Sequence, residues 1–131
     1  DLELDYGNPD QISHEMQKIL EIRQKKFPID LPNCGSVFTS PRYLQARGAP
    51  PGKLIEDAGL KGFNIGDAQV SDCHANFIVN TGNTTACDVI RLVHYIRRRV
   101  FESNGLWLEC EIKYINEFGD IQQLHEVRYI D

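Results

Sequence analysis

The stretch Asn33-Cys34-Gly35-Ser36-Val37-Phe38-Thr39-Ser40-Pro41 organises the 131-residue chain. It follows a long polar helix pattern that ends at Phe27-Pro28. Its Gly35-Ser36 pair, placed before apolar residues, predicts a tight turn that enters a strand, where glycine lets the backbone come close to a ligand. Ser36 would then lie at the mouth of a site, where a positioned proton donor is useful. The same residues also suit a turn in which the Ser36 hydroxyl only satisfies a backbone group.

Length, composition and charge limit the classes of protein to which this chain can belong. A chain of 131 residues that is 41% hydrophobic can form one core but not a second independent one. The net charge of -5 argues against nucleic acid or an anionic membrane surface as the main partner. No apolar run is long enough to span a membrane, and no basic-then-apolar leader is present, so we expect a cytoplasmic protein without a membrane partner.

The four cysteines are scattered through the chain, at positions 34, 73, 87 and 110, with no Cys-x-x-Cys pair. This spacing matches neither a zinc site nor a disulfide framework, so we expect reduced thiols and no metal. Cys34 could act as a nucleophile if a histidine lay beside it, and otherwise is expected to be a small buried apolar residue.

Three segments carry helix signals. Asn8 caps a helix with Pro9 in its first turn and an inner apolar stripe, and Phe27-Pro28 ends it. A short helix runs from Pro50-Pro51-Gly52 to Ala58, closed by a left-handed Gly59. A second long helix begins at a variant capping box and ends at Asn104-Gly105. The residues of the first stripe are Ile12, Met16, Ile19 and Leu20, and those of the capping box are Thr85 and Asp88.

The rest of the chain reads as strands and loops. We expect a strand over residues 1–6, an extended link over 29–33 and a loop over 42–51. Short apolar runs between residues 60 and 80 predict strands with tight connections. Alternation from Leu106 to Tyr114 predicts a strand with Glu109 and Glu111 on one face, and a hairpin loop over 117–120 leads to a returning strand over 121–129. The class is α+β: a small antiparallel or mixed sheet with two longer helices and one short helix, in a single domain.

A basic face on the second long helix leaves two interpretations open. Its arginines could bind phosphate, or they could form a solvated face that suits the helix dipole at the carboxyl end. The residues concerned are Arg91, Arg97, Arg98 and Arg99.

Several linked motifs follow one another along the chain: Gly35-Ser36-Val37-Phe38-x-x-Pro41, Leu54-Ile55-Glu56-x-Ala58-Gly59-Leu60-Lys61-Gly62, Ile65-Gly66-x-Ala68-Gln69-Val70-Ser71, His74-Ala75-Asn76-Phe77-Ile78-Val79-Asn80 and Leu108-Glu109-x-Glu111. Their order resembles that in UDP-N-acetylenolpyruvoylglucosamine reductase, also called UDP-N-acetylmuramate dehydrogenase. Over roughly residues 28 to 120 the chain resembles the C-terminal substrate-binding domain of that family, and the shared register makes the match more specific than any one motif.

The resemblance implies an enzyme that uses FAD and NADPH to convert UDP-N-acetylglucosamine enolpyruvate to UDP-N-acetylmuramate for peptidoglycan. It implies that Ser36 protonates the carbanion or enol left by hydride transfer and that Glu111 works at the same centre. Hydride addition to one carbon of a conjugated acid leaves charge on the other, so an acid and electrostatic support are needed together.

The other residue roles that the resemblance implies concern substrate binding. The resemblance implies that Lys61 and His74 contact the substrate and that Asp120 lies near the nucleotide end, although each also suits a structural or surface role. The family often has a basic residue and Asn before Pro41, where this chain has Thr39 and Ser40, so an amide contact would become a hydroxyl contact from Ser40. Asp67 stands in place of a common Gly and Cys110 in place of a common Pro, and these departures bear on affinity.

Two hypotheses of different classes stand at this point. In the first, residues 1–27 lead from a missing N-terminal flavin-binding domain and residues 28–131 form the substrate domain, inactive alone and without a bound cofactor. The start at Asp1 without an initiating methionine favours this hypothesis. In the second, the chain is a stand-alone module that binds a UDP-sugar or a protein without redox activity.

Overall fold

A computed structural model describes residues 4–39 and 49–128 of the chain. Within these ranges the chain forms three helices, a four-stranded sheet and a separate two-stranded sheet, which confirms the α+β class. The helices are α1 (Pro9–Lys26), α3 (Pro51–Asp57) and α4 (Ala86–Asn104), with a short 3-10 turn η1 (Leu124–Glu126) near the end. The strands are β1 (Asn33–Ser36), β2 (Asn64–Ile65), β3 (Ala68–Val70), β4 (Phe77–Asn80), β5 (Lys113–Ile115) and β6 (Ile121–Gln123).

The larger sheet has the order β1-β4-β3-β2, and every neighbouring pair is antiparallel. Between the Asn33–Val79 and Ser36–Phe77 pairs the register shifts, so β1 contains a bulge. Gly35 lies inside this bulge at a φ of 82°, a left-handed conformation that favours glycine. The expected tight turn at Gly35-Ser36 is therefore wrong, and Ser36 is the last residue of a bulged strand.

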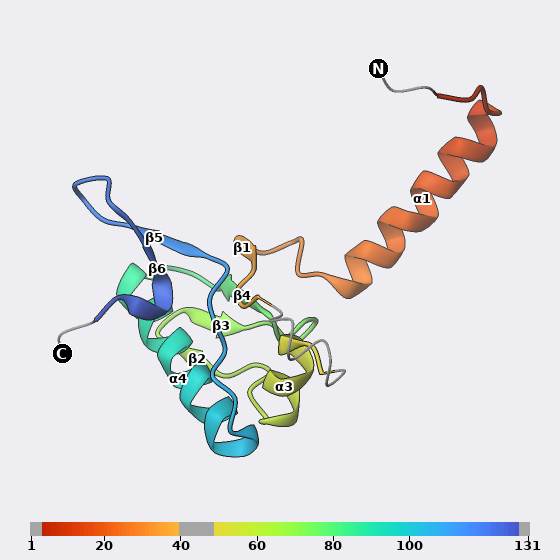
Figure 1. Ribbon diagram of the computed structural model, residues 1–131. Helices are drawn as coiled ribbons and strands as arrows, with labels where there is room; N and C mark the ends of the chain where they lie inside the picture. Colours follow the sequence, from red (N-terminus) through yellow and green to blue (C-terminus); the bar gives the residue numbers. More distant parts are fainter. Residues whose placement is uncertain (1–3, 40–48, 129–131) are drawn as a thin grey trace.

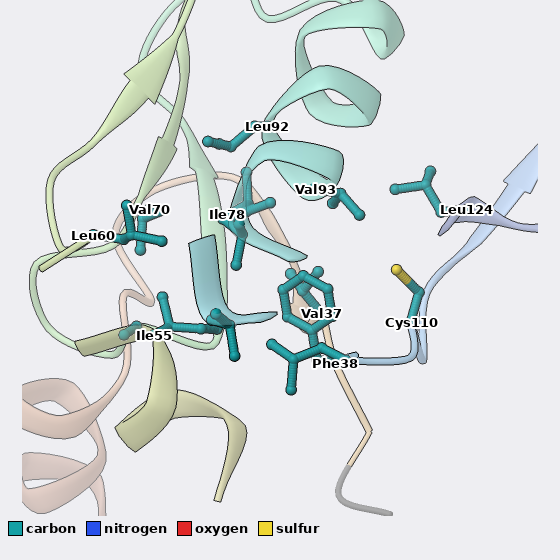
Figure 2. Close-up of a cluster of buried hydrophobic side chains, with 14 of the residues drawn as sticks. Val37, Phe38, Ile55, Leu60, Val70, Ile78, Leu92, Val93, Cys110 and Leu124 are labelled. Atoms are coloured by element: carbon teal, nitrogen blue, oxygen red, sulfur yellow. The ribbon is translucent and has the colours of Figure 1, made fainter. Parts of the chain in front are cut away.

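Helix α4 covers one face of the sheet and supplies much of the core (Figure 1). Its buried residues recur at helical spacing and belong to one core cluster with Val37 and Phe38, which follow β1, and with side chains from α3, β3 and β4 (Figure 2). The Thr85–Asp88 capping box begins the helix, and Gly105 at a φ of 69° ends it, as the sequence predicts. The side chains buried most completely are Val37, Phe38, Ile55, Val70, Leu92, Val93, Ile96, Val100 and Leu108.

Helix α1 projects away from this core (Figure 1). Its ends match the sequence signals, because Asn8 accepts a hydrogen bond from the Asp10 amide and Phe27 ends the helix. The expected inner stripe is wrong, however, since the helix has no buried residue and Leu20 is 53% exposed. Residues 4–6 are not a strand either, and residues 1–3 lie outside the described part of the chain.

The chain between α1 and β1 turns instead of extending. The Ile29 amide donates to the Phe27 carbonyl, and the Asn33 side chain donates to the carbonyls of Pro28 and Leu31. These local hydrogen bonds satisfy the backbone in a turn, so the expected extended link is wrong.

The segment before β5 keeps the predicted alternation without forming the predicted long strand. Leu108 and Cys110 are buried while Glu109 and Glu111 are exposed, but only an isolated bridge joins Cys110 to Phe38. A regular ladder is absent from residues 106–112 because a single short partner, residues 37–39, lies beside them. The returning strand also stops early, at Gln123, and continues as η1. Within the described residues, none of the helices is both long and apolar enough to cross a bilayer.

Two leucine substitutions test this division between core and projecting helix. Leu92→Ala removes a side chain with no exposed surface and should lower the free energy of unfolding by about 2–5 kcal/mol. Leu20→Ala in α1 is the matched control and should change it by less than about 0.5 kcal/mol. Urea denaturation of the chain measures both, and a large loss for Leu20→Ala would mean that α1 is packed.

Candidate active site

A polar hollow of about 360 Å³ lies between the end of β1, the start of α3 and the connection from β3 to β4. It brings together three of the residues singled out from the sequence: Ser36, Lys61 and His74. The other lining residues are Pro50, Pro51, Gly52, Lys53, Glu56, Cys73, Ala75 and Asn76. A second hollow, on the Cys34 side of the sheet, is mostly apolar and has no charged side chain in its wall. Because the first hollow contains these three residues together with a second lysine, Lys53, it is the candidate site for a charged ligand.

Ser36 owes its position to the bulge in β1. It pairs with Phe77 of β4, and the next residue, Val37, donates its amide to the Asn76 carbonyl at 2.9 Å. A bulge bends its strand and re-aims the side chains beside it. Ser36 is exposed, so its hydroxyl is accessible to a molecule in the hollow.

Glu111 is tied to the same segment through its backbone. Its amide donates to the Val37 carbonyl at 2.8 Å, so the residue that follows Ser36 holds Glu111. The Glu111 side chain is exposed and is not part of the hollow's wall. The structure therefore brings the backbones of the two predicted catalytic residues together, with Val37 between them.

His74 forms one wall of the hollow. Its ring stacks on Phe27 with centroids 5.5 Å apart and meets the edge of Phe77. Its Nδ1 accepts the Asn76 amide proton at 3.2 Å, which puts the proton of a neutral ring on Nε2. Burial lowers the pKa of His74, and the charges of Lys26 and Lys61 lower it further.

Two lysines give the hollow a positive rim. Lys61 pairs with Glu56 at 2.9 Å, and Lys53 pairs with Asp57 one turn along α3. All four side chains are at least one-third exposed, and exposed ion pairs contribute little to stability. Lys61 can therefore exchange its Glu56 contact for an anionic ligand at small cost.

The structure does not bring every predicted residue to the hollow. Asp120 lies in the β5–β6 loop. Its carboxylate accepts from the side-chain amide of Asn116 at 3.0 Å, and its backbone N–H donates to the side-chain oxygen of Asn116 at 2.8 Å. It therefore has the hairpin role that the sequence left open, away from the hollow's wall. Ser40 lies outside the described residues.

Two arginines of α4 make contacts of different kinds. Arg97 donates to the Leu108 carbonyl at 2.7 Å and lies over the Trp107 ring, so it joins α4 to the following segment instead of forming part of a solvated face. Arg99 pairs with Glu102 within the helix, and no arginine lies in its last turn.

The cysteines give no sign of nucleophilic chemistry. All four are free, as expected, and no group of three metal-binding side chains occurs among the described residues. Cys34 is exposed, which contradicts its expected burial, but partial desolvation of its thiol raises the pKa. Burial raises the pKa of Cys110 to about 11. Neither thiol is thereby activated as a thiolate.

Sequence reasoning gave no role to Asn76, which the structure places in the wall of the hollow and almost fully buried. Its side-chain amide donates to the Phe38 carbonyl at 3.0 Å and accepts from the Phe38 amide at 2.9 Å. The available signal was an asparagine between Ala75 and the apolar run that starts at Phe77, because a polar side chain in a buried run needs partners.

Comparison with known proteins gives a single family. The family model "UDP-N-acetylenolpyruvoylglucosamine reductase, C-terminal domain" matches residues 27–115. A relative named UDP-N-acetylenolpyruvoylglucosamine reductase 1, from Corynebacterium glutamicum, is 45% identical over 121 residues, covering 92% of this chain and 36% of the relative. A reductase from Caldanaerobacter subterraneus is 45% identical over 116 residues, covering 88% of this chain and 37% of the relative.

A solved structure agrees with these relatives. The crystal structure of UDP-N-acetylenolpyruvylglucosamine reductase from Thermus caldophilus matches with a TM-score of 0.60 and 35% identity, covering 83% of this chain and 36% of that one. The chain thus spans little more than a third of the length of the proteins it matches.

The environment of His74 predicts a measurable titration. Its pKa, observed through the ring proton in an NMR titration, should lie below the ordinary value of 6.5 because burial and two lysines disfavour the charged ring. Lys61→Ala should raise this pKa, whereas Lys53→Ala should shift it less, since the charge of Lys61 is one of the two lysine charges that lower it.

The lowered pKa of His74 also determines whether folding stability rises or falls with pH. The unfolded chain takes up the His74 proton at a higher pH than the folded chain does, so this residue makes stability fall as the pH drops through 6.5 towards the folded pKa. A His74 pKa above 6.5 would contradict this description of the site.

Proposed function

Because the chain belongs to the family of the C-terminal domain of UDP-N-acetylenolpyruvoylglucosamine reductase, we propose that it is the substrate-binding and proton-donating part of such a reductase. The observation that carries the proposal is the shared hollow: Ser36, Lys61 and His74 line it, and Glu111 is hydrogen-bonded to the residue after Ser36. Residues 28–131 would form the substrate domain, and residues 1–27 would lead from a flavin-binding domain. The uncovered apolar stripe of α1 supports this division.

The proposed reaction converts UDP-N-acetylglucosamine enolpyruvate to UDP-N-acetylmuramate. Hydride adds to one carbon of the enolpyruvyl double bond, and negative charge develops on the neighbouring carbon, where the carboxylate delocalises it. The Ser36 hydroxyl then donates its proton to that carbon, and solvent returns a proton to the serine oxygen. Glu111, held beside Val37, would act at the same centre, and the hydroxyl donates more readily because charge builds on its acceptor.

FAD and NADPH would be held by the rest of the reductase polypeptide. Among the described residues, α4 offers a long helix N-terminus, the usual place for a pyrophosphate. The Thr85–Asp88 capping box already satisfies that end, and the Asp88 carboxylate places a negative charge there that would repel phosphate. The residues present therefore do not fit a flavin dinucleotide, and the chemistry we assign to this chain is limited to binding, orientation and proton donation.

Lys61 and His74 would contact the anionic substrate from the wall of the hollow. The surface pairing of Lys61 with Glu56 supports this, since an anion can replace the carboxylate. Roles for Ser40 and Asp120 in binding the substrate stay predictions from the resemblance. We place the reaction in the cytoplasm, which four free cysteines support.

Replacing the serine tests the proposal in the full-length reductase that carries this sequence. Ser36→Ala should leave reduction of the enzyme by NADPH intact, because the enolpyruvyl group takes no part in that half-reaction. Reoxidation by substrate should slow by the ~10² to 10⁴ expected of a lost general acid. Stopped-flow measurement of the two half-reactions separates these effects.

Two further variants sharpen this test. Ser36→Cys should recover part of the rate because a thiol is the better acid, and Glu111→Gln should slow the same half-reaction. If Ser36→Ala slows only the NADPH step, or neither step, the serine is not the donor. A protein that binds the UDP-sugar but shows no reductase activity would instead favour a binding module.

Ligand binding to the chain itself gives an independent prediction. UDP-N-acetylglucosamine should bind weakly, because only part of the site is present, and should shift NMR resonances of Ser36, Lys61 and His74. Lys61→Ala should weaken this binding more than Lys53→Ala. Shifts gathered on Arg97 to Arg99 would indicate that the wrong face has been assigned.

A further inference from the structure

Asn76 extends the pairing of β1 with β4 beyond the point where the backbone can do so. The ladder runs from Ser36 opposite Phe77 to the Val37 amide, which donates to the Asn76 carbonyl. Before Asn76 the chain turns away, because the Phe77 amide bonds to the carbonyl of His74. No main-chain group of β4 is then in register with Phe38, and the Asn76 side chain takes that place.

On one edge of the segment, the side-chain amide of Asn76 makes hydrogen bonds to both the backbone N–H and the backbone carbonyl of Phe38. On the other edge, the Val37 carbonyl accepts from the Glu111 amide, and the Thr39 amide donates to the Glu109 carbonyl at 3.0 Å. The segment from Val37 to Thr39 is therefore held on both edges, and Figure 2 shows Val37, Phe38 and Cys110 as members of the buried cluster. An asparagine that is only 7% exposed makes these bonds in a dry environment, where they are strong.

This geometry links Asn76 to the proposed chemistry. Ser36 pairs with Phe77 of β4 and immediately precedes the clamped segment, so its position depends on how that segment is held as well as on its own pairing. The backbone amide of Glu111 donates a hydrogen bond to the Val37 carbonyl of the same segment. We propose that Asn76 is a positioning residue for proton donation: its amide fixes the Val37–Phe38 backbone and thereby sets Ser36 and Glu111 relative to each other. This inference rests on the proposed function of Ser36.

A purely structural role for Asn76 would predict something different. If Asn76 had only that role, its replacement would lower stability without slowing one of the two half-reactions more than the other. A positioning role instead predicts that loss of the amide slows substrate-dependent reoxidation, since displacement of a reacting group by about 1 Å can cost about 100-fold in rate.

The most informative variant is Asn76→Asp, which keeps the shape of the side chain but replaces its NH2 donor with a carboxyl oxygen. An ionised carboxylate can still accept from the Phe38 amide, but it repels the Phe38 carbonyl. A protonated carboxyl restores the missing donor, and burial raises the pKa of such a group. In the full-length reductase, reoxidation by substrate should be about 10- to 100-fold slower at alkaline pH and should recover as the carboxyl is protonated, with reduction by NADPH unchanged.

A double variant tests whether Asn76 acts through Ser36. In a Ser36→Ala background, Asn76→Asp should cause little further loss in the reoxidation step, because the group that it positions is already gone. Asn76→Ala, which removes both hydrogen-bonding groups, should slow the same step without recovery at low pH, and it serves if the aspartate variant does not fold. Val100→Ala, a core substitution in α4, is the control for lost stability and should leave both half-reaction rates unchanged.

The outcomes separate this inference from the proposed function. If Ser36→Ala itself leaves reoxidation unchanged, the proposed function fails. If Ser36→Ala slows reoxidation but Asn76→Asp does not, or if the two losses multiply fully, Asn76 has no positioning role. An equal slowing of both half-reactions by Asn76→Asp would also overturn the inference.

Discussion

Asn76 reaches from the start of β4 to Phe38 and pairs its amide with both backbone groups of that residue. The segment that it holds is part of the core, since Val37 and Phe38 are almost fully buried, and Ser36 of the candidate site directly precedes it. An unpaired amide and carbonyl at this depth would cost about 1–3 kcal/mol each. The packing of the core and the placement of Ser36 therefore depend on the same hydrogen bonds.

Local signals were sufficient for the helices and insufficient for the strands near the site. The caps of α1 and α4 are formed by residues within four positions of each other, so Asn8, Thr85 and Gly105 could be read directly. The alternation after Leu106 correctly predicted which side chains are buried. Whether a ladder forms, however, depends on a distant partner, and the short Val37–Thr39 segment provides only one bridge.

The same distinction applies to the site. Ser36, Lys61 and His74 were identified through motifs, and the hollow brings them together although they come from three separate parts of the chain. Asn76 was missed because its partner, Phe38, lies 38 residues away. The burial of α1 was wrongly expected because periodicity shows that a helix has an apolar face but not what covers it. This chain matches only 36% of the length of such a relative, and the remainder of such a polypeptide can supply that cover.

Hydrogen exchange measures directly whether the clamped segment is as rigid as the core. The amide protons of Val37, Phe38 and Glu111 donate to the Asn76 backbone, the Asn76 side chain and the Val37 carbonyl. If these bonds hold the site to the core, the three protons exchange only through global unfolding, with the same opening free energy as the buried part of α4. Exchange of Phe38 or Glu111 through a low-energy local opening, while α4 stays protected, would contradict that link.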